Sequence, residues 1–198
     1  MNLKLDNETK QRVPEQRFLL HGVAWTQYET LRSTLDNIPG LRLTYLEGML
    51  ELFMPSEEHE EVKKLLARML EWYALERGIR LYAFGSATYR KQATARGLEP
   101  DECYYVETKK EFPDIAIEIV LTSGLLDKLE VYRGLGVPEV WVWQAGSLAI
   151  YRLRGDRYEQ MTQSEFLPEL DLNLLVRCAS MPDQHDAIVA FRDALRQR

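Results

Sequence analysis

Alternating apolar and polar side chains predict several β-strands in this chain. Isoleucine occupies every second position from Ile115 to Ile119, with Ala116 and Glu118 between the isoleucines. A period of two built from β-branched residues is typical of a strand that buries one face. The other expected strands are shorter or less regular, and they cover residues 41–46, 49–54, 79–84, 87–91, 102–106, 139–143, 148–153 and 158–161.

Apolar residues spaced by three and four positions predict helices between these strands. The longest pattern begins after Ser56, which can cap a helix, and it ends at Gly78. A shorter pattern includes Lys128 near its start and ends at Gly134. Two further helices are expected, at residues 25–35 and 183–198.

The order of these elements predicts the fold class. Its centre reads helix, strand, strand, strand, helix, strand, and the last strand–helix–strand unit is typical of a right-handed crossover between parallel strands. We therefore expect an α/β fold with a mixed sheet and an αβββαβ core, preceded by a helix and a hairpin and followed by a hairpin and a helix. The 198 residues fit one domain. We expect a polar arm over residues 1–24 and a single domain over residues 25–198, with its core at about 41–143.

Composition and charge bear on whether the chain is a nucleic-acid-binding, secreted or membrane protein. The net charge is −6, which lacks the basic footprint that nucleic-acid binding usually leaves. Cys103 and Cys178 form no C-x-x-C pair, which favours a reduced, cytoplasmic protein. The first twenty residues are interrupted by charges, unlike a signal peptide, and no run approaches the roughly 18 apolar residues that cross a membrane.

Two acids in this pattern suggest a metal site. Asp101 immediately precedes the strand at 102–106, and Glu118 lies within the apolar strand at 114–120. If the two strands are neighbours, the carboxylates can converge, and a cation between them would relieve their repulsion. Oxygen ligands suit Mg²⁺ or Mn²⁺. The alternative is a solvated strand face that carries two unrelated acids.

Basic residues and a histidine near these acids have two interpretations each. The long side chain of Lys128 can reach back to the strand of Glu118, or it can be a solvated helix residue. His59 shares the inner face of its helix, where a packed or capping histidine is more common than a ligand. A hairpin tip carries the only basic cluster close to the acids. Its residues are candidates for nucleic-acid binding or simply a solvated loop, and they are Arg90, Lys91 and Arg96.

Several segments in combination resemble the PD-(D/E)XK, or restriction-endonuclease-like, superfamily and, more narrowly, the Uma-two family of endonucleases. The resemblance covers most of the chain from about residue 41 to 143. It is carried by Leu46-Glu47-Gly48 with Glu51, Pro55-Ser56 with His59, Glu99-Pro100-Asp101-Glu102, Pro113–Val120, Thr122-Ser123-Gly124, Lys128–Tyr132 and Gly136–Trp141.

The resemblance implies roles for individual residues. The metal-binding aspartate of the superfamily falls on Asp101 and its second acid on Glu118. The superfamily's lysine, two residues after that acid, is replaced here by Val120. The Uma-two family resembles a variant in which the following helix supplies this lysine. Lys128 occupies that place. Glu47 and His59 match recurrent family positions and are possible outer members of the site.

The implied function is endonuclease activity, in which Mg²⁺ or Mn²⁺ assists hydrolysis of phosphodiester bonds in DNA. Symmetric cleavage of a duplex favours a homodimer. One alternative is a nucleic-acid or protein interaction module that kept the fold and lost turnover, which the acidic net charge and Val120 favour. Another is a metal-dependent hydrolase of smaller phosphoesters, because fold alone does not fix a substrate.

Overall fold

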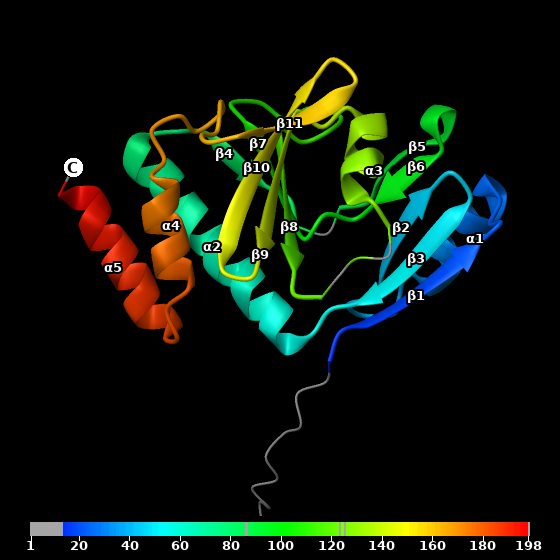
Figure 1. Ribbon diagram of the computed structural model, residues 1–198, viewed down its shortest axis with the longest axis horizontal. Helices are drawn as coiled ribbons and strands as arrows, with labels where there is room; N and C mark the ends of the chain where they lie inside the picture. Colours follow the sequence, from blue (N-terminus) through cyan, green and yellow to red (C-terminus); the bar gives the residue numbers. More distant parts are fainter. Residues whose placement is uncertain (1–13, 86, 123, 125, 198) are drawn as a thin grey trace, which may run out of the picture.

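A computed structural model describes residues 14–85, 87–122, 124 and 126–197. In this part of the chain, eleven strands form two sheets, which pack with five α-helices (Figure 1). The core sheet has six strands in the order β11-β10-β9-β8-β7-β4, and the side sheet has five in the order β1-β3-β2-β6-β5. The core sheet consists of β4 (Leu81–Ala83), β7 (Glu102–Val106), β8 (Ile115–Val120), β9 (Glu139–Gln144), β10 (Ser147–Arg154) and β11 (Arg157–Met161). The side sheet consists of β1 (Gln16–His21), β2 (Arg42–Leu46), β3 (Met49–Met54), β5 (Tyr89–Lys91) and β6 (Arg96–Leu98).

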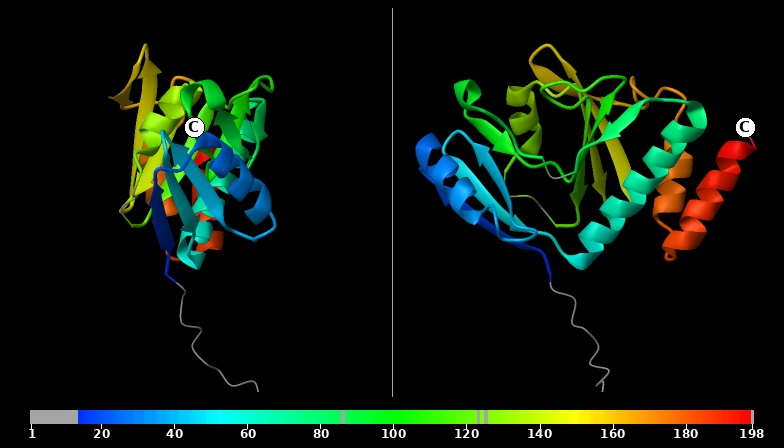
Figure 2. Two further views of the ribbon diagram at one scale, coloured as in Figure 1. Left: turned by 90° about the vertical axis from the view of Figure 1, so that its right-hand side faces the viewer. Right: turned by 180° about the vertical axis from the view of Figure 1, so that it is seen from behind.

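The helices lie on both sides of the core sheet, except for the first, which packs on the side sheet. They are α1 (Trp25–Leu35), α2 (Glu57–Arg77), α3 (Lys128–Leu135), α4 (Leu172–Ala179) and α5 (Gln184–Arg196), with a 3-10 turn at Gln92–Thr94. Helices α2, α4 and α5 cover one face, and α3 and the side sheet lie toward the other (Figures 1 and 2). Among the described helices, none combines the length and apolar character needed to span a membrane.

The expected α/β core is confirmed. Within the core sheet, α2, β4, β7, β8, α3 and β9 follow one another in the predicted αβββαβ order, with the β5–β6 hairpin inserted into the side sheet. Strands β8 and β9 are parallel and α3 connects them, whereas β7 pairs with β8 in the antiparallel sense. The beginning of β7 therefore lies beside the middle of β8, because Glu102 is opposite Ile117.

The two faces of β8 contact different parts of the molecule. Its isoleucines pack into the main core with α2, α4 and α5. Its other face carries Ala116, which packs with Val131 and Tyr132 of α3. Glu118 lies on this second face, two residues from Ala116. The alternation that predicts the strand therefore also places Glu118 toward α3.

Helix α2 begins and ends where its capping residues predict. The hydroxyl oxygen of Ser56 accepts a hydrogen bond from the backbone N–H of His59 at 3.2 Å. Gly78 ends the helix with a φ of 68°, a left-handed conformation that glycine adopts without a Cβ penalty. The cap fixes the first turn of α2 and thereby points His59 inward, where it is fully buried.

The structure differs from the expected polar arm at residues 16–21, which form β1 at the edge of the side sheet. Strand β1 pairs with β3 over its whole length, from Gln16 opposite Met54 to His21 opposite Met49. Backbone pairing, more than burial, orders this segment, since Phe18 is 63% exposed. With apolar residues on both faces, its sequence shows no clear core-facing side.

Candidate active site

Charged side chains are buried where the side sheet meets the first turns of α2 and α3. This charged cluster consists of Arg42, Glu51, His59, Lys63, Asp101 and Glu118, all of which are less than 7% exposed. Burying an ionised group without a partner costs several kcal/mol. The partners of these side chains therefore decide how the cluster is stabilised and what it can bind.

Asp101 is fixed by three contacts from different parts of the fold. Its Oδ2 atom accepts a hydrogen bond of 2.7 Å from the backbone N–H of Ile119 in β8. The same oxygen lies 3.1 Å from Nε2 of His59. Its Oδ1 atom forms an ion pair with Arg42 at the start of β2. The Asp101 carboxylate is therefore held directly beside the peptide bond that joins Glu118 to Ile119.

Glu118 takes both of its partners from α3. Its Oε2 atom lies 2.5 Å from Nζ of Lys128, and its Oε1 atom accepts a hydrogen bond from the Tyr132 hydroxyl. Burial first, and then the neighbouring Glu118 carboxylate, raise the pKa of Tyr132 well above its ordinary value. Tyr132 therefore stays a neutral donor. Lys128 reaches back from the start of α3 to the strand of Glu118.

The ring of Phe53 connects the two halves of the charged cluster. Its centroid lies 5.4 Å from the centroid of the His59 ring and 5.7 Å from Nζ of Lys128. His59 contacts Asp101, and Lys128 contacts Glu118, so one buried ring adjoins the partners of both acids. The two carboxylates thus belong to one cluster, although each has its own basic partner.

A third carboxylate extends the charged cluster onto β1. Glu51 lies 3.3 Å from Nη1 of Arg17, whose guanidinium carbon also lies 3.7 Å from the Phe53 centroid. Arg17 in turn lies 3.6 Å from Glu15, which accepts a hydrogen bond from Thr122. The pairing of β1 with β3 is what brings Arg17 to this position.

His59, Glu60 and Lys63 form the α2 side of the site. Burial lowers the pKa of His59, which favours the neutral imidazole. Contact with His59, and then pairing with Lys63, lower the pKa of Glu60 to about 2. Glu60 also binds Nη2 of Arg42 at 2.8 Å. Arg42 therefore bridges two carboxylates, those of Glu60 and Asp101.

Asp101 and Glu118 are the two carboxylates of the charged cluster that could hold a hard divalent cation. Among the described residues, no group of three or more histidines, cysteines or acids is arranged to hold a metal. Magnesium sites in phosphoryl-transfer enzymes commonly use only one or two carboxylates and complete the shell with water and phosphate oxygens. Asp101, just before β7, and Glu118, on β8, could supply two such carboxylates, which would form an open site and not a closed protein cage.

The remaining predicted site residues lie among other contacts. Glu47, just after β2, binds Nη2 of Arg96 at 2.8 Å. Arg96 is only 5% exposed and also donates to the backbone oxygens of Thr94 and Glu130. Arg96 therefore links the side sheet to α3. Arg90 pairs with Glu29 of α1 at 3.2 Å. Lys91, like Arg90, lies exposed on β5 at the edge of the side sheet.

Sequence reasoning missed several residues around the acids, namely Arg17, Arg42, Glu60, Lys63 and Tyr132. One signal was available: Lys63 lies four residues after His59, on the same buried stripe of α2 as Leu66. A cation on a buried stripe indicates an acid close by, and the partner of Lys63 is Glu60. Tyr132 was recognised only as part of the Lys128–Tyr132 segment that carries the family resemblance. Arg17 lay in the segment expected to be an arm.

A carboxylate before β7, a second on β8 and a lysine on the crossover helix identify an α/β protein of the restriction-endonuclease-like class. A model of the Uma2 family, described as "Putative restriction endonuclease", matches residues 25–181. The chain therefore belongs to this family, and the resemblance to Uma-two proteins is confirmed.

Solved structures are also similar, though distantly. Among them is the crystal structure of a "putative nuclease" from Anabaena variabilis, with 14% sequence identity and a TM-score of 0.44, over 75% of this chain and 90% of that chain. No curated protein matches this chain.

Proposed function

We propose that this protein is an endonuclease that hydrolyses phosphodiester bonds of DNA with the help of Mg²⁺ or Mn²⁺. One observation carries the proposal. Asp101, just before β7, and Glu118, on the neighbouring β8, are both buried, and the Asp101 carboxylate binds the amide next to Glu118. Membership in a restriction endonuclease family supports a nucleic-acid substrate.

The metal would be held by Asp101 and Glu118. An ion bound there would lower the pKa of a water molecule and would neutralise negative charge that builds up on the scissile phosphate. Tyr132 orients Glu118 by donating to its Oε1 atom. His59, kept neutral by burial, contacts Asp101 and limits the directions that its carboxylate can take.

Lys128 is the proposed cationic catalyst. Its ammonium group lies against Glu118, with an exposed fraction of 17% for the side chain. A lysine amine positioned there can stabilise the negative charge of the transition state, or orient the attacking water. Val120 occupies the position of the usual superfamily lysine, so Lys128 is the described cation best placed to replace it.

Each acid of the charged cluster has a cation beside it before any ligand binds. Asp101 pairs with Arg42, Glu118 with Lys128, and Glu51 with Arg17. Added divalent charge would therefore need compensation, and a phosphodiester supplies negative charge. This pairing favours binding of metal and nucleic acid together.

The alternative is a nucleic-acid-binding module without turnover. The direct pairing of Arg42 and Lys128 with the two acids favours it, because side-chain cations can substitute structurally for a metal. The net charge of −6 also favours it. Metal binding separates the two functions, since only the enzyme needs it.

The assay is nicking of supercoiled plasmid in Mg²⁺ or Mn²⁺. Asp101→Asn and Glu118→Gln remove the proposed ligand charges, and Glu130→Gln removes an exposed acid of α3 as a matched control. We expect the wild type and the control to nick, and the two ligand variants to lose at least about a hundredfold in rate. Equal nicking by all four proteins would indicate a contaminant. No cleavage of any DNA by the wild type would contradict the proposal.

We further propose a homodimer, with the β10–β11 hairpin or α5 as the interface. Cutting both strands of a duplex suits two sites related by a two-fold axis. Light scattering during size-exclusion chromatography should then give about twice the chain mass of 23.1 kDa. A mass that stays at one chain at micromolar concentration would contradict the dimer.

A further inference from the structure

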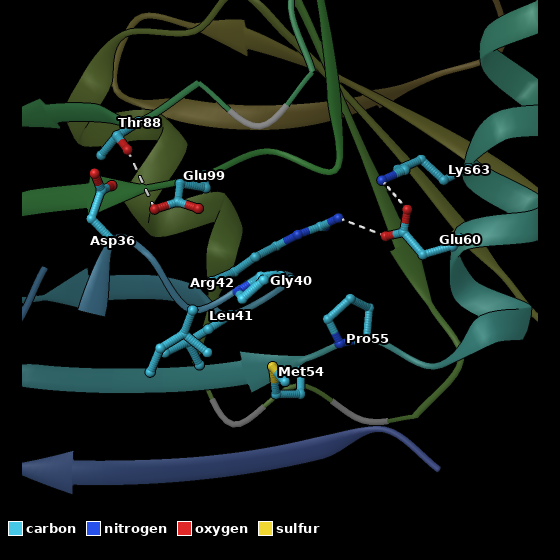
Figure 3. A pocket seen from close by; sticks show the side chains of 12 residues that line it. Asp36, Gly40, Leu41, Arg42, Met54, Pro55, Glu60, Lys63, Thr88 and Glu99 are labelled. Carbon is cyan, nitrogen blue, oxygen red and sulfur yellow. Dashed lines mark hydrogen bonds and ion pairs between the residues drawn. The ribbon is translucent and has the colours of Figure 1, made fainter. Parts of the chain in front are cut away.

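A pocket beside Asp101 is not used by the proposed chemistry. It has a volume of about 620 Å³, within the range of sites that bind small molecules. Its two ends differ in charge. Figure 3 shows Glu60 and Lys63 at one end, Thr88 and Glu99 at the other, and Arg42 between them.

The cationic end is built to receive phosphate. Arg42 binds both Glu60 and Asp101, so its guanidinium can exchange one carboxylate for a phosphate oxygen and keep the other. Lys63 adds a second cation, held against Glu60 and only 6% exposed. Because Arg42 touches both the pocket and Asp101, a phosphate bound here lies next to the proposed metal ligands.

The wall between the two ends offers apolar surface. Ile38 is 42% exposed and Met54 is 36% exposed, and both line the pocket with Pro55. Exposed apolar side chains of this size suit the flat face of a nucleic-acid base. Leu41 and Pro39 continue the same wall.

The other end presents an acceptor. Oε1 of Glu99 accepts a hydrogen bond of 3.3 Å from the Thr88 hydroxyl. A carboxylate accepts well from an exocyclic amino group, and it repels a carbonyl oxygen at the same position. Cytosine and adenine carry such an amino group, whereas thymine and uracil carry a carbonyl oxygen there.

We propose that this pocket binds the nucleotide next to the scissile phosphate, with Arg42 and Lys63 on its phosphate and Glu99 selecting a base with an exocyclic amino group. The inference rests on the proposed nuclease function for its setting, but the pocket can be tested by binding alone. In this pocket, Glu99 is a specificity residue and Arg42 is a positioning residue. The proposed metal ligands and cationic catalyst remain Asp101, Glu118 and Lys128.

The test is calorimetric binding of dCMP and dUMP, which differ mainly in the amino group, to the full chain with Mg²⁺ present. We expect the wild type to bind dCMP about tenfold more tightly, the preference that one well-placed hydrogen bond provides. Glu99→Gln should bring the two affinities within about twofold, because an amide both donates and accepts. Lys63→Gln should weaken both nucleotides and keep their ratio. Glu130→Gln is again the control.

Three outcomes would overturn the proposal: equal binding of the two nucleotides by the wild type, an unchanged preference in Glu99→Gln, or no binding of either nucleotide. Circular dichroism of each variant checks that it is folded. The Asp101→Asn protein provides a further distinction, since its base preference should survive the loss of nicking. Base selection without any plasmid cleavage would contradict the nuclease function and support the nucleotide-binding pocket. Cleavage without base selection would support the nuclease function and contradict the nucleotide-binding pocket.

Discussion

Replacing Lys128 with methionine should destabilise the fold and make its stability depend on divalent cations. Lys128 lies 2.5 Å from Glu118, a carboxylate that is only 2% exposed. Removing one partner of a buried ion pair costs about 3–5 kcal/mol, and the hydrogen bond from Tyr132 that remains favours the lower value. About 3 kcal/mol corresponds to a fall in Tm of about 6–12 °C for a chain of this size.

Thermal unfolding followed by circular dichroism, in EDTA and in millimolar Mn²⁺, measures this effect. If Asp101 and Glu118 hold a cation, Mn²⁺ should raise the Tm of Lys128→Met more than that of the wild type, because the ion replaces the lost positive charge. The double variant Glu118→Gln/Lys128→Met removes both charges, so it should recover most of the stability in EDTA and respond little to Mn²⁺.

Two results would refute this reasoning. A loss of less than about 1 kcal/mol in Lys128→Met would mean that the contact with Glu118 is of the weak, solvated kind. An equal response of the single and double variants to Mn²⁺ would mean that the ion binds elsewhere.

Three further predictions concern the hydroxyl of Tyr132, the two cysteines and the imidazole of His59. Tyr132→Phe removes a hydrogen bond to a buried carboxylate and should cost about 1.5–3 kcal/mol in chemical denaturation; a loss below about 0.5 kcal/mol would argue against that bond. The pKa of Cys103 is raised to about 12 and that of Cys178 is also raised, mainly by burial, so a thiol reagent at pH 8 should label neither cysteine until the protein is unfolded; fast labelling of the native chain would contradict their burial. Because burial lowers the pKa of His59 below its value in the unfolded chain, the unfolded state binds more protons, and stability should fall as the pH drops below about 6.5. The Tm of His59→Asn should fall less over that range, and identical pH profiles would exclude this contribution.

The sequence predicted the parts of the fold in which local pattern and tertiary burial agree. The isoleucines of β8 face one core, so their alternation was regular. Helix α2 carries its own cap and stop at Ser56 and Gly78. Helix α4 was missed because eight mostly apolar residues do not distinguish a helix from a buried strand by periodicity. Strand β1 was missed because its order depends on pairing with β3.

The candidate site divides in the same way. Asp101 and Glu118 were identified because an acid within or next to an apolar strand is unusual. Their partners could not be found locally, since Arg42 meets Asp101 across 59 positions of sequence and only the packing of the two sheets brings them together. Arg96 shows the converse. It resembled a member of a surface basic patch, yet Glu47, 49 positions away, and the backbone of α3 keep it buried.

Calorimetric titration of the wild type with Mn²⁺ tests the central claim most directly, because it requires neither a substrate nor turnover. A site formed by Asp101 and Glu118 predicts one ion per chain, and loss of binding in both Asp101→Asn and Glu118→Gln but not in Glu130→Gln. No heat of binding in the wild type, or binding that survives both ligand substitutions, would contradict the metal site.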